Sequence, residues 1–475
     1  MEPSIFNLRV PLPERNEVFL MNTLTDAQIV VSPDVAELLD RAANGTVDMA
    51  ADELAAVDAL VENGFLVEGH HADRRALDQY FQDVREDASQ LRVTVLTTLQ
   101  CNFACDYCYQ GDHGDYNKFA HKMSLETAEQ VGDWVEARLD AVGAETLVLT
   151  FFGGEPLLNV PVMYRLSERL SHAARARGRR ILIHIITNGL LLTPEIVDHL
   201  LPLGLNGIKV TLDGDQVTHD RMRPLRGGQG TFTQIVENVR RVADKVAIAV
   251  GGNFDESSVD SFPALLDFLK EQEFADKLSK VAFKPIVRQA GVGPRPGLEA
   301  PAPAVKGMLA LTPVGGDGKP LNGTCMTSVG AGGSPCDTCH FVEEKSAALR
   351  QETRKRGFPT TDGVHMGPCE IHRRHAHTIG PDGSLYACPG FTGEQSKSVG
   401  HIDGRHESWR AREAERFDHL AAWKSCGDCA FIPVCAGGCS VASHIELGDM
   451  QTPTCHKSSF ETALVALAAD VAGRA

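Results

Sequence analysis

Cys101, Cys105 and Cys108 are the residues whose types and spacing carry the most chemical information in this chain. Their C-x3-C-x2-C spacing lets one short loop bring three thiolates to three corners of a cube. A 4Fe–4S cluster held by three protein thiolates keeps its fourth iron open to an exogenous ligand, whereas a structural or electron-transfer cluster normally has a fourth cysteine there. The spacing therefore predicts an open iron–sulfur site. The alternative is a zinc knuckle or a set of ordinary thiols.

A second motif, Gly153-Gly154-Glu155-Pro156, follows the next strand that the sequence predicts. Two glycines let the backbone approach a ligand closely, and the glutamate places a carboxylate beside it. A tight turn between strand and helix would use the same pair of glycines. The position of the motif, one strand–helix unit after the cysteines, favours a binding loop.

Polar residues also end the next two predicted strands. Thr187 and Asn188 end one of them, Asp213 ends the other, and Arg223 follows shortly after. Such side chains can meet the ribose and carboxylate of a cofactor, and the planar fork of arginine binds a carboxylate bidentately. The alternative is that Asp213 caps a helix and that Arg223 makes an ordinary surface salt bridge.

Seven more cysteines lie in the C-terminal region in a fixed order. They are Cys369, Cys388, Cys426, Cys429, Cys435, Cys439 and Cys455. The x3 spacing between the fifth and sixth of them lets these two thiols point to opposite sides of a turn, so that two groups can interleave. Two zinc ribbons are the alternative, because paired cysteines also hold zinc.

Together, the triplet, the Gly-Gly-Glu-Pro loop and the C-terminal cysteine order resemble the radical S-adenosylmethionine (SAM) superfamily with a SPASM auxiliary-cluster extension. The resemblance covers roughly residues 90–460 and implies an enzyme with SAM, one radical SAM 4Fe–4S cluster and two auxiliary 4Fe–4S clusters. In this family the first cluster supports cleavage of SAM to a 5′-deoxyadenosyl radical, which removes a hydrogen atom from the substrate.

The resemblance also implies roles for single residues. The Gly-Gly-Glu loop would bind the amino group of SAM, an aromatic residue would lie beside the open iron, and an arginine would bind the carboxylate of SAM. The implied cofactor-binding residues are Tyr107, Gly153, Gly154, Glu155, Thr187, Asn188 and Arg223. The sequence does not identify a catalytic residue.

For the auxiliary clusters, the family pattern implies two ligand sets. One set is Cys426, Cys429, Cys435 and Cys455, and the other has three members, Cys369, Cys388 and Cys439. Some relatives complete the second set with a cysteine between its first two positions, where this chain has none. Either Cys325, Cys336 or Cys339 reaches in, or that cluster has an open iron. Cys336 and Cys339 could instead form a small metal site with His340, or remain thiols.

Regular alternation of strands and helices must position these residues. Strands predicted at 92–98, 146–152, 180–187, 207–212, 245–251 and 280–286 alternate with helices near 124–142, 159–177, 193–203, 231–244 and 257–272. Six such repeats favour a parallel sheet with right-handed crossovers, and six strands in place of eight favour a partial barrel. Function in such sheets lies at the carboxyl ends of the strands, and the cysteine triplet directly follows the first one.

We therefore expect an α/β protein of several parts. They are a small winged-helix-like peptide-recognition domain at 1–90, a partial (β/α)6 barrel at 91–290, a Gly- and Pro-rich bridging segment at 291–365 and a Cys-rich auxiliary-cluster domain with a closing helix at 366–475. His375 and His377 alternate on a predicted strand, and we expect a solvated, charged strand there in preference to a metal site.

Composition excludes several classes of function. A net charge of −17 argues against nucleic acid as the main partner, because a phosphate-binding surface needs a basic excess. Residues 1–20 carry charges throughout and no later apolar run approaches the length of a membrane span, so we expect neither a signal peptide nor a membrane. The chain has thirteen clustered cysteines, an odd number, which favours metal ligation over disulfides. This use of cysteine also indicates a reducing cytoplasm.

The resulting prediction is a radical SAM maturase that forms a thioether or carbon–carbon cross-link in a peptide or protein. Its partners would be that substrate, with or without a leader segment, and an electron donor such as flavodoxin or ferredoxin. The N-terminal domain would add the leader as a strand. A close alternative is an anaerobic sulfatase maturase, although such relatives have Asp where Pro389 follows Cys388 here. The alternative from another class is a non-catalytic metal-binding or electron-transfer protein.

Overall fold

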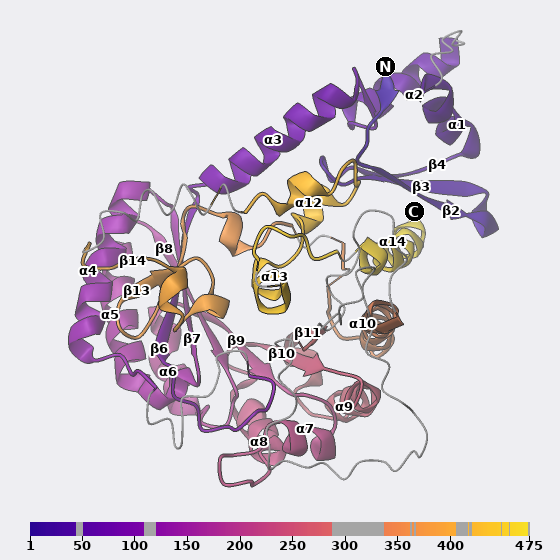
Figure 1. The fold of residues 1–475 in the computed structure, drawn as a ribbon. Helices are drawn as coiled ribbons and strands as arrows, with labels where there is room; N and C mark the ends of the chain where they lie inside the picture. The colour runs from indigo at the N-terminus through magenta and orange to yellow at the C-terminus, as the bar shows by residue number, and fades with distance from the viewer. Residues whose placement is uncertain are drawn as a thin grey trace, which may run out of the picture.

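The computed structural model describes residues 1–43, 51–108, 120–286, 337–361, 363–364, 367–404, 417, 420–447, 449–455 and 457–473. Its largest unit is a nine-stranded sheet in the order β11-β10-β9-β8-β7-β6-β12-β13-β14, whose barrel strands form an open arc in Figure 1. Cys325 and Cys336 lie outside the described residues, and the side chain of Cys339 does as well.

The six barrel strands of this sheet run parallel, and each pairs with its neighbours in sequence. They are β6 (Gln90–Thr98), β7 (Thr146–Gly153), β8 (Arg180–Thr187), β9 (Leu205–Thr211), β10 (Ala247–Phe254) and β11 (Leu278–Pro285). The predicted α/β fold with a partial barrel is confirmed, and the predicted strands agree with the observed ones to within a few residues.

Helices cross between these strands and cover one face of the sheet. They are α4 (Leu125–Val142), α5 (Val160–Ala176), α6 (Pro194–Leu200), α7 (Gln216–Met222), α8 (Phe232–Val242) and α9 (Phe262–Lys270). Local signals set their ends: Ser124 accepts a hydrogen bond from the Thr127 N–H at the start of α4, and Gly143 ends that helix in the left-handed conformation. The strand residues beneath the helices are buried apolar side chains such as Leu149, Ile185 and Val210.

The N-terminal module holds a three-stranded antiparallel sheet in the order β2-β3-β4, a two-stranded sheet and three helices. Its elements are β1 (Glu2–Pro3), β2 (Asn7–Leu12), β3 (Glu17–Asn22), β4 (Gln28–Val31), α1 (Pro33–Ala43), α2 (Ala51–Glu62), β5 (Leu66–Val67) and α3 (His70–Glu86). Strand β4 is an edge strand, since within the described residues only β3 pairs with it. The winged-helix resemblance stays a prediction.

The Cys-rich region adds strands to the barrel sheet, which the sequence did not predict. Strand β12 (Ala376–Ile379) pairs parallel to β6, and β13 (Ser384–Tyr386) and β14 (Ser398–His401) follow antiparallel. The expectation of a solvated strand is wrong for His377. This residue is 8% exposed and its ring meets Trp134 edge-on at 5.0 Å, because β12 lies against β6.

The remaining C-terminal elements connect the two ends of the chain. They are α10 (Asp337–Lys355), α12 (Ile432–Cys435), α13 (Ser440–Leu447) and α14 (Lys457–Ala472). Apolar residues of α14, among them Leu464 and Leu467, share one hydrophobic cluster with Val10, Phe19 and Met21 of β2 and β3. The core of the N-terminal module is therefore completed by the closing helix, which lies beside it in Figure 1.

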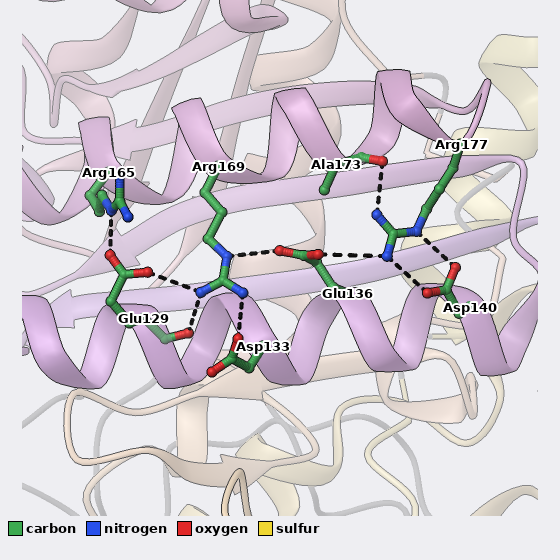
Figure 2. A network of polar contacts seen from close by, with 8 residues as sticks. All are labelled: Glu129, Asp133, Glu136, Asp140, Arg165, Arg169, Ala173 and Arg177. Carbon is green, nitrogen blue, oxygen red and sulfur yellow. Dashed lines mark hydrogen bonds and ion pairs between the residues drawn. The ribbon is translucent and has the colours of Figure 1, made fainter.

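An ion-pair network, which we call the α4–α5 ladder, joins two helices on the outside of the barrel (Figure 2). The acidic residues Glu129, Asp133, Glu136 and Asp140 stand on α4. Arg165 and Arg169 stand on α5, and Arg177 directly follows its last residue. Arg169 is central: its guanidinium contacts Glu136 at 2.7 Å and Glu129 at 3.0 Å and also pairs with Asp133. The ladder faces away from the cysteines, on the helix side of the sheet.

A membrane-crossing helix would need a long apolar stretch with few charges. None of the helices in the described residues has one.

Candidate functional site

The triplet Cys101, Cys105 and Cys108 lies in the loop that follows β6. The segment after α7 holds this loop: Ala104 N–H donates to the Pro224 carbonyl at 2.9 Å, and Arg226 Nε donates to the Cys101 carbonyl at 2.9 Å. The pKa of the Cys101 thiol responds to the charge of Cys108, and that of the Cys105 thiol responds to the charges of Cys101 and Cys108. The loop therefore gathers three thiols at the carboxyl end of the first barrel strand.

Burial raises the pKa of the Cys101 thiol to about 11 and that of the Cys105 thiol to about 12. For Cys101 the charge of Glu155 adds to this effect, while in both cases the guanidinium of Arg223 acts in the opposite direction. Buried thiols with raised pKa values are protonated at neutral pH and ionise when they bind a cation such as iron. This donor set is suited to a metal centre and poorly suited to a free nucleophile.

Gly153 and Gly154 bring the end of β7 onto the backbone that leads into the cysteine loop. Gly154 N–H donates to the Thr98 carbonyl at 2.9 Å, and Glu155 N–H donates to the Gln100 carbonyl at 2.8 Å. A Cβ on Gly153 would lie 2.2 Å from the Thr98 oxygen, and one on Gly154 would lie 2.3 Å from the Gln100 oxygen. The glycines thus permit a close approach between two strand ends, and that approach fixes the glutamate.

Glu155 has no exposed surface, and its carboxylate accepts three hydrogen bonds. Oε1 accepts from Thr187 Oγ1 at 2.7 Å and from the Leu157 N–H at 3.0 Å, and Oε2 accepts from the Asn188 N–H at 2.7 Å. Burial raises the pKa of this carboxyl even though these donors favour its charged form. The glutamate therefore ties the end of β7 to the end of β8, where Thr187 and Asn188 stand.

Tyr107 and Arg223 meet in a second buried cluster. Arg223 Nη1 donates to the Tyr107 hydroxyl at 2.6 Å and lies 3.5 Å from Asp213 Oδ2, to which that hydroxyl donates. Asn253 N–H donates to Asp213 Oδ1 at 2.7 Å. Within the described residues, Nε of Arg223 is buried and has no hydrogen-bond partner. One donor of this arginine is thus available to an anionic ligand.

Both alternatives for Asp213 and Arg223 are excluded. Arg223 is 9% exposed, so its pairing with Asp213 is no surface salt bridge. Asp215, and not Asp213, caps α7, because its carboxylate accepts from the Thr218 N–H. Although burial opposes the charge of Arg223, the tyrosine, Cys105 and Asp213 raise the pKa of its guanidinium well above the usual value.

The C-terminal cysteines gather in two groups. Cys388 senses the charges of Cys369 and Cys439, and Cys435 senses those of Cys426, Cys455 and Cys429. Burial raises the pKa of Cys369 and Cys426 to about 11 and that of Cys388 and Cys435 to about 12. These are the two sets that the resemblance implies, and their ligation of clusters stays a prediction. No three His, Cys, Asp or Glu side chains in the described residues converge tightly enough to hold a single metal ion.

Comparison with known proteins decides the family. The model of the Radical SAM superfamily matches residues 95–261. This part of the chain belongs to that superfamily.

The relatives and neighbours of the radical SAM domain span several activities. The chain is 27% identical over 190 residues to the Fe-coproporphyrin III synthase of Methanosarcina barkeri, a match that covers 40% of this chain and 42% of that protein. It is 24% identical over 355 residues to the serine-type anaerobic sulfatase-maturating enzyme of Bacteroides thetaiotaomicron, covering 71% and 80%. The solved structure of anSMEcpe with AdoMet and the Cp18Cys peptide has a TM-score of 0.57, 16% identity and coverage of 81% and 99%.

The superfamily uses SAM and a 4Fe–4S cluster, and the residues described above are suited to both. Two thiols whose pKa is raised by burial, Cys101 and Cys105, and the thiol of Cys108 in the same loop match the three cysteine ligands of such a cluster. The Arg223 Nε without a partner is a suitable donor for a carboxylate.

Sequence reasoning missed residues that complete the radical SAM site. Asn253 ends β10 and holds Asp213, and Asn102 accepts a hydrogen bond from Asn188 Nδ2 at 2.7 Å. His219 is fully buried, accepts from the Asp213 N–H through Nδ1 and has a pKa well below its usual value because of burial. A rule to inspect every polar residue at a strand's carboxyl end would have found Asn253. No spacing signal points to His219.

Proposed function

We propose that this chain is a radical SAM maturase that modifies a side chain of a peptide or protein. The observation that carries the proposal is the Cys101–Cys105–Cys108 group at the carboxyl end of β6, with two further cysteine groups beside the same barrel. When bound, the reduced cluster and SAM supply a carbon-centred radical that removes a hydrogen atom from the substrate.

In this proposal the chain's own residues bind and orient SAM. Arg223 would bind the carboxylate through its free Nε, and Tyr107 and Asp213 hold the guanidinium in place. Glu155 would meet the amino group through Oε2, which accepts only one hydrogen bond among the described residues. Thr187 and Asn188 keep the carboxylate in position. Five of these six side chains are buried and Tyr107 is half-buried, which excludes water from the reacting centre.

Two features support a peptide substrate. The solved structure of anSMEcpe was determined with a bound peptide and covers most of this chain. The edge of β4 offers unpaired backbone groups to an added strand, as leader recognition would require. The module also contacts the C-terminal region, since Phe81 of α3 stacks on Trp423 at 4.5 Å, next to Cys426. We infer that a leader held at β4 would guide its core segment toward the barrel, where a thioether or carbon–carbon bond would form.

Formylglycine formation on a sulfatase is the second candidate. The match to the sulfatase-maturating enzyme covers 71% of this chain and favours it. Pro389 after Cys388 argues against it, because a proline cannot supply the carboxylate that such enzymes place there. A peptide carrying the serine or cysteine of a sulfatase site distinguishes the two, since only the second candidate predicts its oxidation.

Iron content and SAM cleavage test the proposal. Three clusters would give about 12 irons per chain after anaerobic reconstitution. Replacing Cys101, Cys105 and Cys108 by Ala should remove about 4 of these and abolish 5′-deoxyadenosine production. The matched control is the Ala triple variant of Cys369, Cys388 and Cys439, which should lose iron but keep uncoupled SAM cleavage. A reconstituted protein that binds only zinc would end the radical SAM proposal for the whole chain.

A further inference from the structure

Three lysines stand on the face of the sheet that looks into the barrel. Lys209 of β9 and Lys280 of β11 are both in register with Ala249 of β10, and Lys284 is in register with Asn253. Register partners point to the same side of a sheet, and the neighbouring positions Val210, Val250 and Val281 are buried beneath the helices. The three lysine side chains therefore share the lumen face.

The Lys209 side chain lies across its neighbouring strand. A Cβ added to Gly251 of β10 would lie 2.6 Å from Lys209 Cε and 3.4 Å from Nζ. Any larger residue at position 251 would push this side chain away. The glycine therefore makes room for the lysine to extend toward β11, where the other two lysines stand.

The charges of these lysines are not compensated. Among the residues that the structure describes, no carboxylate pairs with Lys209, Lys280 or Lys284. Partial desolvation by the lumen walls, with the nearby charges of Lys284 and Lys280, lowers the pKa of Lys209 to about 8. A concentration of positive charge in a chain of net charge −17 creates a local field that attracts anions.

Of the three lysines, Lys284 lies at the level of the candidate site, and Lys209 and Lys280 stand four residues earlier in the register, beside Ala249. Asn253, the register partner of Lys284, donates to Asp213 of the Tyr107–Arg223 cluster. Burial raises the pKa of Cys388, and the charge of Lys284 opposes that rise, which places this lysine near the second cysteine group. The lumen face that carries the three lysines thus extends between the group of Cys101 and the group of Cys388, where a substrate would be held.

We propose that Lys209, Lys280 and Lys284 bind carboxylates of the substrate, and that the modified segment of the peptide carries acidic side chains next to its reacting residue. This inference rests on the proposed function, because that function makes a peptide the source of the carboxylates. The propionates of a tetrapyrrole have the same chemistry and are the other source that the experiment separates.

Binding of two labelled tetrapeptides to the reconstituted, SAM-loaded protein tests the proposal. The probes are rhodamine-labelled tetraglutamate and tetraglutamine, followed by fluorescence anisotropy at low salt. Tetraglutamate should bind at least tenfold more tightly than tetraglutamine, and Lys209→Met with Lys284→Met should abolish that difference. Lys245→Met is the matched control, because Lys245 pairs with Asp198 on the helix side. Equal binding of the two probes, or an unchanged double variant, overturns the proposal.

Two further measurements keep the outcome decisive. If the double variant fails to retain iron, the rate of chemical acetylation of Lys209 in the unaltered protein is measured in place of binding to the variant. Tetraglutamate should slow that acetylation severalfold, and tetraglutamine should not. Equal acetylation rates with the two peptides overturn the proposal. Coproporphyrin III is the second arm. Lysine-dependent binding of the porphyrin without binding of tetraglutamate would support a carboxylate site at the lysines and overturn the proposal that the substrate is a peptide. Failure of the lysine site and failure of the proposed function are therefore distinguishable.

Discussion

Glu155 combines complete burial with three accepted hydrogen bonds, and this combination gives the residue two tasks. It joins the ends of β7 and β8, and it keeps one oxygen able to accept a further donor. Because burial raises its carboxyl pKa, the charged form is costly until a cation such as an amino group lies beside it. The residue is therefore prepared for a cationic ligand.

Glu155→Gln should weaken SAM binding while the clusters remain. Loss of a charge-assisted hydrogen bond would cost roughly 1.5–3 kcal/mol of binding free energy, which equilibrium dialysis of SAM would measure. Glu145→Gln is the control, since that exposed glutamate precedes the opposite end of β7. Unchanged SAM affinity in the Glu155 variant would remove this residue from the binding site.

Gly154→Ala should disrupt the first cysteine group. The new Cβ would lie 2.3 Å from the Gln100 carbonyl oxygen, so the backbone leading to Cys101 must move. Iron analysis should then show a loss of about 4 irons per chain, with no 5′-deoxyadenosine formed. Gly207→Ala is a fitting comparison, because its Cβ would meet only ordinary contacts of 3.5 Å and longer. Normal iron content in Gly154→Ala would show that the close approach is dispensable.

Acidic-peptide binding should weaken as pH rises. Lys209 has a folded pKa near 8, lowered by the lumen walls and by Lys280 and Lys284 of β11. Its charge is therefore present below that pH and lost above it, and a bound carboxylate requires the charge. Tetraglutamate affinity should fall about tenfold between pH 7 and pH 9 as the protonated fraction declines. Lys209→Met should give a flat profile over that range, and a flat profile in the unaltered protein would contradict this account.

At the scale of elements, the α4–α5 ladder shows how two parallel helices are held in register on the outside of the barrel (Figure 2). Its acidic residues recur every three or four positions and its arginines at intervals of four and eight, which places them on facing sides of the two helices. Arg169 is 20% exposed and bonds three carboxylates, so it contributes more than an isolated surface pair.

Arg169→Met should lower Tm by about 2–4 °C and leave SAM cleavage unchanged. The difference should shrink at high salt, since partly exposed ion pairs are screened. Arg240→Met provides the comparison, because Arg240 makes an exposed pair with Glu237 three positions away. A change in SAM cleavage at full iron content would show that the ladder affects the site as well as the fold.

The elements were largely predictable from the sequence, and the contacts between them were not. Strands such as β7 follow from apolar runs bounded by turns. The first cysteine group follows from its spacing, and the division of the other cysteines into two groups follows from the resemblance to the SPASM extension. The joining of β12 to β6 depends on a pairing between residues 376 and 92, which no local pattern encodes. The same holds for Asp213 and Asn253, and for Lys209, whose lumen position depends on strand register across the whole sheet.

At the scale of the whole molecule, the N-terminal module can be tested through its edge. In an antiparallel ladder, neighbouring residues of an edge strand direct their N–H groups alternately to the partner and to the outside. Of Ile29→Pro and Val30→Pro, one should therefore remove an outward N–H and the other a bond to β3. The variant that removes an outward N–H should abolish modification of a leader-bearing substrate at an unchanged Tm. The variant that removes a bond to β3 should lower Tm.

The readout for this pair is substrate modification at low concentration beside uncoupled SAM cleavage, which both variants should retain. Point variants are preferable to deletion of residues 1–90, because deletion would expose the apolar face of α14. Full modification by both variants would show that β4 adds no strand from the substrate.

The shared core of α14 with β2 and β3 also has a consequence for the order of synthesis. Phe19 and Met21 leave the ribosome before any barrel strand exists, but their partners Leu464 and Leu467 are made only after the last cysteine. Domains ordinarily fold in the order of their synthesis, and here the first module cannot finish before the last helix arrives. A nascent chain would thus complete the sheet that carries the β4 edge only once the rest of the chain has been made. Under the proposed function, a precursor peptide would therefore meet a protein whose synthesis is complete.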